Sequence, residues 1–245
     1  ITAVARFLLT TGIELIRKKY GDKAVVYCHT DGINTNCDID VDWLTKRLRL
    51  ILEATIPNTE SNWISLDKDV FREGIWIQIG NYVLRNEDGS ITKHGSTFKA
   101  STRSKFYKSI LNRLIDARLD NRVTNTFIDE LYNFDDLPME TFIQRRTLNR
   151  KFEDYKSETD MMIPLVKQGI EVGIQPEIRT TYEYYKTKDG YRIKELVKSK
   201  TDLDVSYYWN IVTKLLDKFG LAHYVKKKPP LTLLDRSQQS LMEWV

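Results

Sequence analysis

The sequence has few cysteines, few histidines and no long apolar run, and each shortage excludes a class of protein. Two cysteines among 245 residues, Cys28 and Cys37, are too few for a disulfide framework, so reduced thiols in an intracellular protein are expected. The histidines lie far apart in the sequence, and no Cys/His spacing is typical of a zinc site. No apolar stretch approaches the length that spans a bilayer, and there is no signal-peptide pattern, so we expect no membrane partner.

The rest of the composition is that of an ordinary folded protein. Hydrophobic residues make up 41% and charged residues 29% of the chain. The length suffices for one large or two small domains. The net charge of +4 is mildly basic, so the distribution of the cations matters more than their sum. Because the first residue is Ile1 and not Met, we expect the chain to begin inside a longer protein or to have been trimmed.

Residues 1–95 mix helical and strand patterns, which predicts an α+β fold with helices on one face of a sheet. The spacing of apolar residues predicts two helices, at 2–20 and 40–54. A β-hairpin over 24–36 lies between them, and Cys28 and Cys37 could face each other across it. Further strands are predicted at 63–66, 71–84 and 90–93.

After Gly95 the sequence becomes mostly helical and basic. Helices are predicted at 101–119, 124–132, from 136 to 144, through most of the chain to Gly169, and at 204–219. A small β-hairpin is predicted from 182–186 and 191–195. Three lysines and two prolines then predict a linker. The expected organisation is therefore 1–95, 96–225, and a linker with a tail at 226–245.

The first hairpin carries a carboxylate at its tip. A run of strand-forming residues, 24–28, leads to His29, Thr30, Asp31 and Gly32. A carboxylate that buried strands hold in place is well positioned to bind a metal ion. An Asp-Gly step is also an ordinary hairpin turn selected for positive φ, so the turn alone leaves both interpretations open.

Several stretches resemble, in order, the C-terminal part of a family B DNA polymerase, which comprises the end of the palm domain and the thumb. Ile1-Thr2-Ala3 with Arg6 resembles the start of the helix before motif C. Residues 27–32, Tyr-Cys-His-Thr-Asp-Gly, resemble motif C, usually Tyr-x-Asp-Thr-Asp followed by Ser or Gly. Residues 81–84 and 92–95 are similar to the palm–thumb stretch that holds primer-template DNA. Residues 202–208 with Phe219-Gly220 are similar to the thumb signature, Leu-Asp-x-x-Tyr-Tyr and a later Phe-Gly.

This resemblance implies nucleotidyl transfer with two Mg²⁺ ions. It assigns the catalytic tip to His29, Thr30 and Asp31, with Asp31 as a metal ligand beside a carboxylate of motif A. Motifs A and B and a proofreading exonuclease are absent from these residues. We therefore expect a fragment, or the small partner of a split polymerase, that needs an N-terminal portion carrying motifs A and B to use a dNTP.

The chain departs from the family pattern in two places. His29 replaces the first aspartate of motif C. A neutral imidazole is a poor Mg²⁺ ligand, whereas a charged one can pair with a phosphate, and a local hydrogen bond at the hairpin tip is the alternative. Residues 80–82, Gly-Asn-Tyr, stand where lysines and arginine are usual, which leaves Tyr82 and backbone amides to contact DNA.

Basic and hydroxyl residues cluster around the boundary near residue 95. Such residues usually contact phosphates, and these contacts carry no sequence information. The predicted DNA contacts are Tyr82, Lys93, Gly95, Lys99, Arg103 and Lys105. The alternative is a solvated helix face, as most charge runs are.

The last eight residues resemble a sliding-clamp (PCNA-like) interaction motif. Leu241 and Trp244 lie one helical turn apart and would anchor the tail in a groove, beside Val245 and with Gln238 at the rim. The alternative is an amphipathic end that packs on its own domain.

Three functions thus remain open: part of a DNA polymerase; a non-catalytic relative, inactivated at His29, that binds DNA and a clamp; and an unrelated basic binding domain. The clamp-like tail favours a prokaryotic cell of archaeal type, or its virus, with the protein in the cytoplasm or nucleoid.

Overall fold

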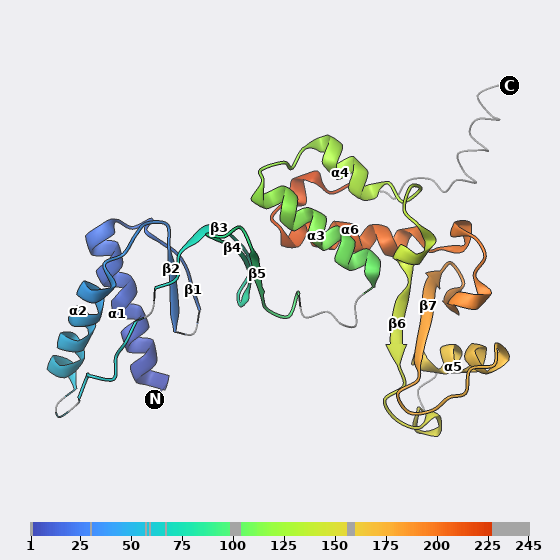
Figure 1. The fold of residues 1–245 in the computed structure, drawn as a ribbon, viewed down its shortest axis with the longest axis horizontal. Helices are drawn as coiled ribbons and strands as arrows, with labels where there is room; N and C mark the ends of the chain where they lie inside the picture. The colour runs from blue at the N-terminus through green and yellow to red at the C-terminus, as the bar shows by residue number, and fades with distance from the viewer. Residues whose placement is uncertain are drawn as a thin grey trace. The chain divides into compact units, whose positions relative to one another are not determined.

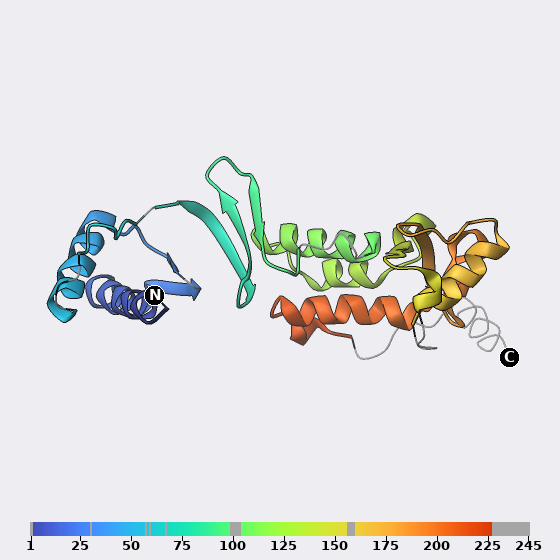
Figure 2. The same ribbon diagram turned by 90° about the horizontal axis from the view of Figure 1, so that it is seen from below.

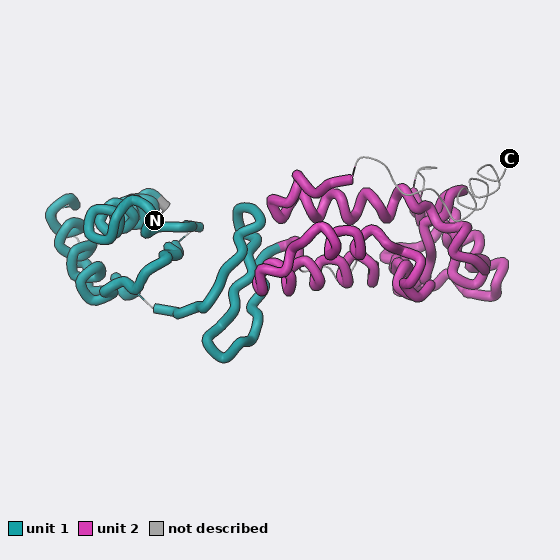
Figure 3. The backbone as a smooth tube through the Cα atoms, turned by 90° about the horizontal axis from the view of Figure 1, so that it is seen from above, with its two compact units in different colours: residues 1–95 teal, residues 96–245 magenta. Residues whose placement is uncertain are grey.

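The computed structural model describes residues 2–29, 31–56, 58, 60–66, 68–98, 104–155 and 160–226. The chain divides into two compact units, 1–95 and 96–245 (Figure 3). Helices and antiparallel sheets are both present, as the predicted α+β class requires. Within the described ranges, no helix is both long enough and apolar enough to cross a membrane.

The first unit begins with two helices and a hairpin, as predicted (Figure 1). Their bounds are α1 (Thr2–Tyr20), β1 (Val25–His29), β2 (Gly32–Thr35) and α2 (Val41–Thr55). Asp40 begins α2, because its carboxylate accepts a hydrogen bond from the backbone N–H of Trp43 at 2.9 Å. Buried Ile16, Leu44 and Leu48 form the core between the two helices and the hairpin.

An antiparallel sheet in the order β3-β4-β5 completes this unit. Its strands are β3 (Phe71–Gln78), β4 (Asn81–Asn86) and β5 (Ile91–His94). The prediction of one strand over 71–84 is wrong, because Gly80 adopts φ = +70° and the chain reverses there. The strand predicted at 63–66 is also wrong: Arg49 Nε donates to the Ile64 carbonyl at 3.1 Å and fixes an irregular segment.

The two cysteines do not face each other across the first hairpin. Cys28 pairs with Ile33 and Val25 pairs with Thr35, so Cys37 lies beyond the base of the hairpin. β2 ends at Thr35, and Cys37 follows in a bend where its carbonyl accepts from the Thr35 hydroxyl at 2.9 Å. A disulfide needs Cα atoms within about 7 Å. Both thiols are free and exposed.

In the second unit the helices α3 and α6 run side by side (Figures 1 and 2). The helices are α3 (Lys105–Leu119), α4 (Asn125–Tyr132), α5 (Met162–Glu171) and α6 (Val205–Lys218). The side chains of Ser104, Thr124 and Asp204 cap α3, α4 and α6 by accepting from backbone N–H groups at 3.0–3.1 Å. The helix predicted from 101 therefore starts at Lys105, and 101–103 lie outside the described residues.

A second antiparallel sheet, β6-β7-β8, packs with α5 in this unit. Its strands are β6 (Gln144–Thr147), β7 (Thr181–Thr187) and β8 (Gly190–Ile193). The hairpin predicted from 182–195 is confirmed. The prediction of a helix over 136–144 is wrong, because only one 3₁₀ turn (Met139–Phe142) follows Pro138. The chain then forms strand β6, which pairs with β7. The prediction of mostly helical structure up to Gly169 is therefore wrong as well.

Candidate functional site

The hairpin β1–β2 presents Asp31 at its tip. His29 pairs with Gly32 across the ladder, so the connection contains only two residues, Thr30 and Asp31. Asp31 is exposed, and Thr30 lies outside the described residues. Gly32 is the first residue of β2 and has no positive φ, and no residue of β1 or β2 is fully buried, so the expected positive-φ turn between buried strands is not what the structure shows. The hairpin therefore offers an accessible carboxylate.

A single carboxylate by itself does not make a Mg²⁺ site. Mg²⁺ is usually held in proteins by one or two carboxylates together with several waters and substrate oxygens. Among the residues that the structure describes, no three His, Cys, Asp or Glu side chains come close enough to hold a metal ion. Asp31 therefore offers a single carboxylate and belongs to no such group among the described residues.

Tyr27 fastens this hairpin to the turn between β3 and β4. Its hydroxyl accepts a hydrogen bond from the Gly80 N–H at 2.7 Å, although 53 residues separate the two in the chain. The Tyr27 ring also packs on Trp76 and Tyr82, with centroid distances of 6.0 and 5.9 Å. Because the strand alternates, Tyr27 and His29 lie on the same face of β1. These contacts hold the β1–β2 hairpin, with the predicted catalytic tip, against the sheet β3-β4-β5.

A row of aromatic side chains crosses the sheet β3-β4-β5 beside this contact. Trp76 pairs with Tyr82, and Tyr82 pairs with His94. The rings of Tyr82 and His94 stack at 4.8 Å with an angle of 12°. Tyr82 is half-buried between Tyr27 and His94, so only part of its ring is accessible. Lys93 is the neighbour of His94 in β5 and hence points to the opposite face, away from Tyr82.

His29 lies over the β3–β4 turn. A Cβ atom built on Gly80 would lie 3.4 Å from Nε2 and 3.7 Å from Cε1 of His29. The His29 ring is also nearly parallel to that of Tyr27, at 15° and 6.4 Å. The two departures from the family pattern, at 29 and 80–82, are therefore neighbours in space.

Gly95 permits a close approach at the end of the same sheet. Its φ is +108°, and a Cβ there would overlap the Gly80 carbonyl oxygen and come within 2.5 Å of Oδ1 of Asn81. Asn81 is only 4% exposed and donates to the Ile79 carbonyl at 3.3 Å. The structure thus shows a packing reason for glycine at 95, where the sequence suggested a DNA contact.

Of the remaining predicted DNA contacts, Lys105 lies within the described residues. Lys105 is exposed and begins α3 in the second unit. Lys99 and Arg103 lie outside the described residues, as do the tail residues Gln238, Leu241, Trp244 and Val245.

The tyrosines of the thumb-like signature, Tyr207 and Tyr208, mainly stabilise the packing of the second unit. Tyr208 is 1% exposed; its hydroxyl donates to the Phe142 carbonyl and accepts from the Lys186 N–H, both at 3.2 Å. The hydroxyls of Tyr207 and Tyr184 both donate to Oε1 of Gln144, at 3.2 and 3.4 Å. Burial raises the pKa of Tyr207 and of Tyr208, so both phenols stay neutral donors. These bonds tie α6 to β6 and β7.

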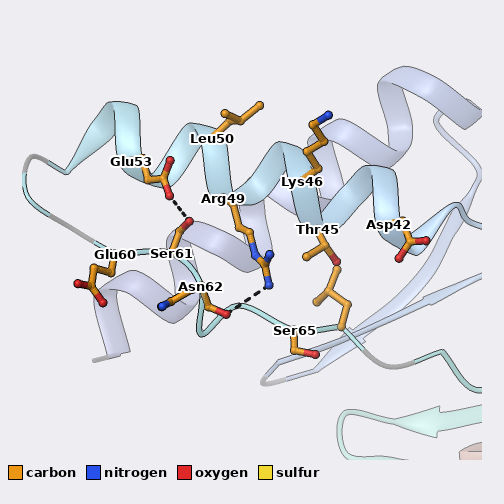
Figure 4. Close-up of a pocket in the computed structure, with 11 residues that line it drawn as sticks. Asp42, Thr45, Lys46, Arg49, Leu50, Glu53, Glu60, Ser61, Asn62 and Ser65 are labelled. Carbon is orange, nitrogen blue, oxygen red and sulfur yellow. Dashed lines mark hydrogen bonds between the residues drawn. The ribbon is translucent and has the colours of Figure 1, made fainter.

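A groove of about 790 Å³ lies between α2 and residues 60–66 (Figure 4). Arg49 donates to the Asn62 carbonyl at 3.3 Å, and the Ser61 hydroxyl donates to Glu53. Acidic and basic side chains are mixed along its walls, and it contains none of the predicted site residues.

The sequence interpretation missed the roles of Tyr27, Trp76 and His94. Their alignment depends on the reversal at Gly80, and the prediction of a single strand over 71–84 concealed it. The aromatic residues on both sides of Gly80 were the available signal.

Comparison with known proteins gives a likeness of fold. No protein-family model matches the chain, and no curated protein matches it. A solved structure of the family B DNA polymerase from the hyperthermophilic archaeon Pyrobaculum calidifontis superimposes with a TM-score of 0.60 at 20% sequence identity. The match covers 94% of this chain and 30% of that polymerase. The chain thus has the fold of part of a family B DNA polymerase and spans about a third of its length.

Proposed function

We propose that this chain is the palm and thumb part of a family B DNA polymerase, with residues 1–95 belonging to the palm and residues 96–225 forming the thumb. The observation that carries the proposal is the fold likeness over 94% of the chain, which agrees with the order of the sequence motifs. The exposed position of Asp31 at the tip of the β1–β2 hairpin supports it, because a motif C carboxylate has to be accessible to bind a metal ion.

In this function Asp31 binds Mg²⁺ together with a carboxylate of motif A from an N-terminal polymerase portion, which also binds the dNTP. Bound Mg²⁺ ions activate the primer 3′-hydroxyl and neutralise the leaving pyrophosphate. Tyr27 keeps the hairpin in place through the Gly80 N–H. Lys93, Lys99, Arg103 and Lys105 bind the backbone of the primer-template.

Primer extension by this chain, assembled with the portion that carries motifs A and B, tests the proposal. Asp31→Ala should lower nucleotide incorporation by about a thousandfold or more, because it removes a metal ligand. Asp22→Ala is the matched control, since Asp22 is an exposed carboxylate in the turn before β1. Incorporation that survives Asp31→Ala would refute the metal-ligand role.

A second candidate is a non-catalytic polymerase relative that binds DNA and a sliding clamp. It is favoured by His29, which replaces an acidic residue and lies against Gly80. If this candidate is correct, the assembled protein binds primer-template but extends no primer, and His29→Asp increases extension.

The tail carries a separate part of the proposal. Gln238, Leu241, Trp244 and Val245 bind a sliding clamp, with Leu241 and Trp244 as the anchors. Calorimetric titration of a PCNA-like clamp should show binding to the full chain, and a loss of at least about tenfold with Leu241→Ala/Trp244→Ala. Equal affinity of the double variant would exclude this role.

A further inference from the structure

The sheet β6-β7-β8 has β6 and β8 at its edges (Figure 1). The side chain of Gln168, from α5, covers the outer edge of β8. Its Nε2 donates to the Tyr191 carbonyl at 3.0 Å, and its Oε1 accepts from the Ile193 N–H at 2.9 Å. A residue of a parallel strand would make this same pair of bonds. Gln168 therefore occupies the place of a neighbouring strand and closes this edge.

The outer edge of β6 is open. The backbone of Leu148, directly after β6, faces β7: its N–H donates to the Thr180 carbonyl at 2.9 Å, and its carbonyl accepts from the Arg179 N–H at 2.7 Å. Backbone groups alternate in direction along an antiparallel strand, so those of Arg145 and Thr147 face away from β7. Among the residues that the structure describes, no hydrogen bond engages these outward N–H and C=O groups. Such an edge can pair with a further strand.

The side chains along this edge are basic. Arg146 is exposed and, within the described ranges, belongs to no ion pair. Arg145 and Lys194 share the carboxylate of Glu183, at 2.6 and 2.9 Å, so that group keeps a net positive charge. Pairing of β6 with a second copy of itself would bring the arginines of both copies together, which is unfavourable. The charge therefore favours an acidic partner over a second copy.

We propose that β6 is a docking edge for an extended acidic peptide segment of a partner protein, which adds to the sheet as one more strand. Its backbone bonds to the outward groups of Arg145 and Thr147 and provides affinity. Its carboxylates pair with Arg146.

The position of Glu183 also sets the pattern of the segment. Arg145 and Arg146 lie on opposite faces of the sheet, and Glu183 already neutralises part of the charge on the face of Arg145. The acidic side chains are therefore expected at every second residue of the segment, on the face of Arg146. This inference goes beyond the proposed function and does not depend on it.

The first test is binding of a peptide to the full chain, followed by fluorescence anisotropy. The probe is a fluorescein-labelled peptide, Thr-Glu-Val-Glu-Val-Glu-Thr. It should bind, and its affinity should fall as salt is added. A peptide of the same composition with its glutamates in one block should bind more weakly, because adjacent residues point to opposite faces. Equal affinities of the two peptides would overturn the proposed pattern.

Two N-methylated forms of the alternating peptide test strand addition itself. The N–H groups of a strand point alternately to its two sides. Methylation of one alternating set removes the donors that face β6, whereas methylation of the other set removes only donors that face away. One form should therefore bind much more weakly than the other. Equal effects of the two methylations would overturn strand addition.

Substitutions in β6 locate the docking edge. Thr147→Pro removes an outward N–H but no bond of the ladder, since proline is tolerated at such positions of edge strands. It should weaken peptide binding at least about fivefold, because a backbone hydrogen bond is lost and the ring obstructs the new strand. Thr147→Val retains the N–H and should bind like wild type. Equal affinities of these two variants would place the peptide elsewhere.

Arg146 is tested against an arginine on the opposite edge strand. Arg146→Ala should weaken binding about two- to fivefold, because one exposed ion pair is lost. Arg192→Ala is the matched control, since Arg192 is an exposed arginine of β8, and it should leave the affinity unchanged. Equal losses would show a general effect of charge and refute the role of Arg146. Thermal unfolding verifies the fold of each variant; should Thr147→Pro not fold, the methylated peptides and Arg146→Ala still decide.

Other occupants of this edge give different results. If a single-stranded oligonucleotide displaces the peptide, and its own affinity falls with Arg146→Ala but not with Thr147→Pro, the edge is a phosphate-binding surface and the proposal is overturned. If the chain self-associates in sedimentation and Thr147→Pro abolishes this, the occupant is a second copy and the proposal is likewise overturned. It also fails if the alternating peptide does not bind at millimolar concentration. None of these results involves primer extension, so the proposed function is tested separately.

Discussion

The two units use their family-like motifs differently. In residues 1–95 Asp31 is exposed at the tip of a hairpin, whereas the motif residues Asn81, Val83 and Leu84 are buried in the sheet beside it. In residues 96–245 the signature tyrosines lie inside, where Tyr208 binds two backbone groups. Similar sequence resemblance therefore marks a candidate site in the first unit and a structural joint in the second. Substitutions should separate these roles.

The largest expected effect is in the first unit. Gly95→Ala combines a positive φ with overlap of the Gly80 carbonyl, and should lower the free energy of unfolding by about 2–5 kcal/mol. Gly220→Ala in the second unit also meets a positive φ, but with nothing within 4 Å, and should cost only about 1 kcal/mol. Chemical denaturation measures both. Equal costs would show that the close packing around Gly95 does not matter.

The next largest effect is expected where Tyr207 and Tyr208 connect α6 to β6 and β7 in the second unit. Tyr208→Phe removes both hydrogen bonds of a buried hydroxyl and should destabilise by about 1–3 kcal/mol. Tyr207→Phe is the matched change at a half-buried neighbour with one such bond, and should cost less. Neither should alter DNA binding by the folded protein. If Tyr208→Phe left the stability unchanged but impaired DNA binding, Tyr208 would belong to a binding site and its structural role would be refuted.

A smaller effect is expected at Tyr27. Tyr27→Phe keeps the ring, loses the bond from the Gly80 N–H, and should destabilise by about 1 kcal/mol while weakening primer-template binding. Tyr20→Phe is its control, because the Tyr20 hydroxyl accepts from the Asp40 N–H at 3.0 Å in the same unit. Both variants should lose similar stability, and only Tyr27→Phe should lose affinity. If Tyr27→Phe and Tyr20→Phe bind primer-template with equal affinity, the hydrogen bond of Tyr27 has no role in DNA binding.

The smallest effect concerns pH. Hydrogen bonds from Lys194 and Arg145, at 2.9 and 2.6 Å, hold the pKa of the Glu183 carboxyl below its ordinary value of 4.5. A carboxyl whose pKa is lower in the folded than in the unfolded protein stabilises the fold at pH values above its unfolded-state pKa. This stabilisation is lost as the pH falls through the folded-state pKa. Because all three groups are partly exposed, the contribution should stay below about 1 kcal/mol. Unfolding of wild type and Glu183→Gln, compared from pH 7 to pH 3, should show a shallower decline in the variant; parallel curves would contradict it.

Local patterns predicted the elements whose signals are local. Asp40, Thr124 and Asp204 cap helices where the sequence placed their starts. The errors occur where distant contacts decide. Residues 144–147 became a strand because β7 was available as a partner, and Ile64 is held by Arg49. The approach of His29 to Gly80 likewise depends on two hairpins that lie far apart in the sequence.

The bond between Tyr27 and Gly80 also has a consequence for the order of folding. It closes a loop of 53 residues, whereas the hairpins β1–β2 and β3–β4 each close over a few. Because loop-closure entropy grows with separation, we expect the hairpins to form first and to meet late. A partly folded first unit would then carry the Asp31 tip without the turn beside it. The assembled site would appear only when this unit completes its folding, so nascent or locally opened chains would not present it.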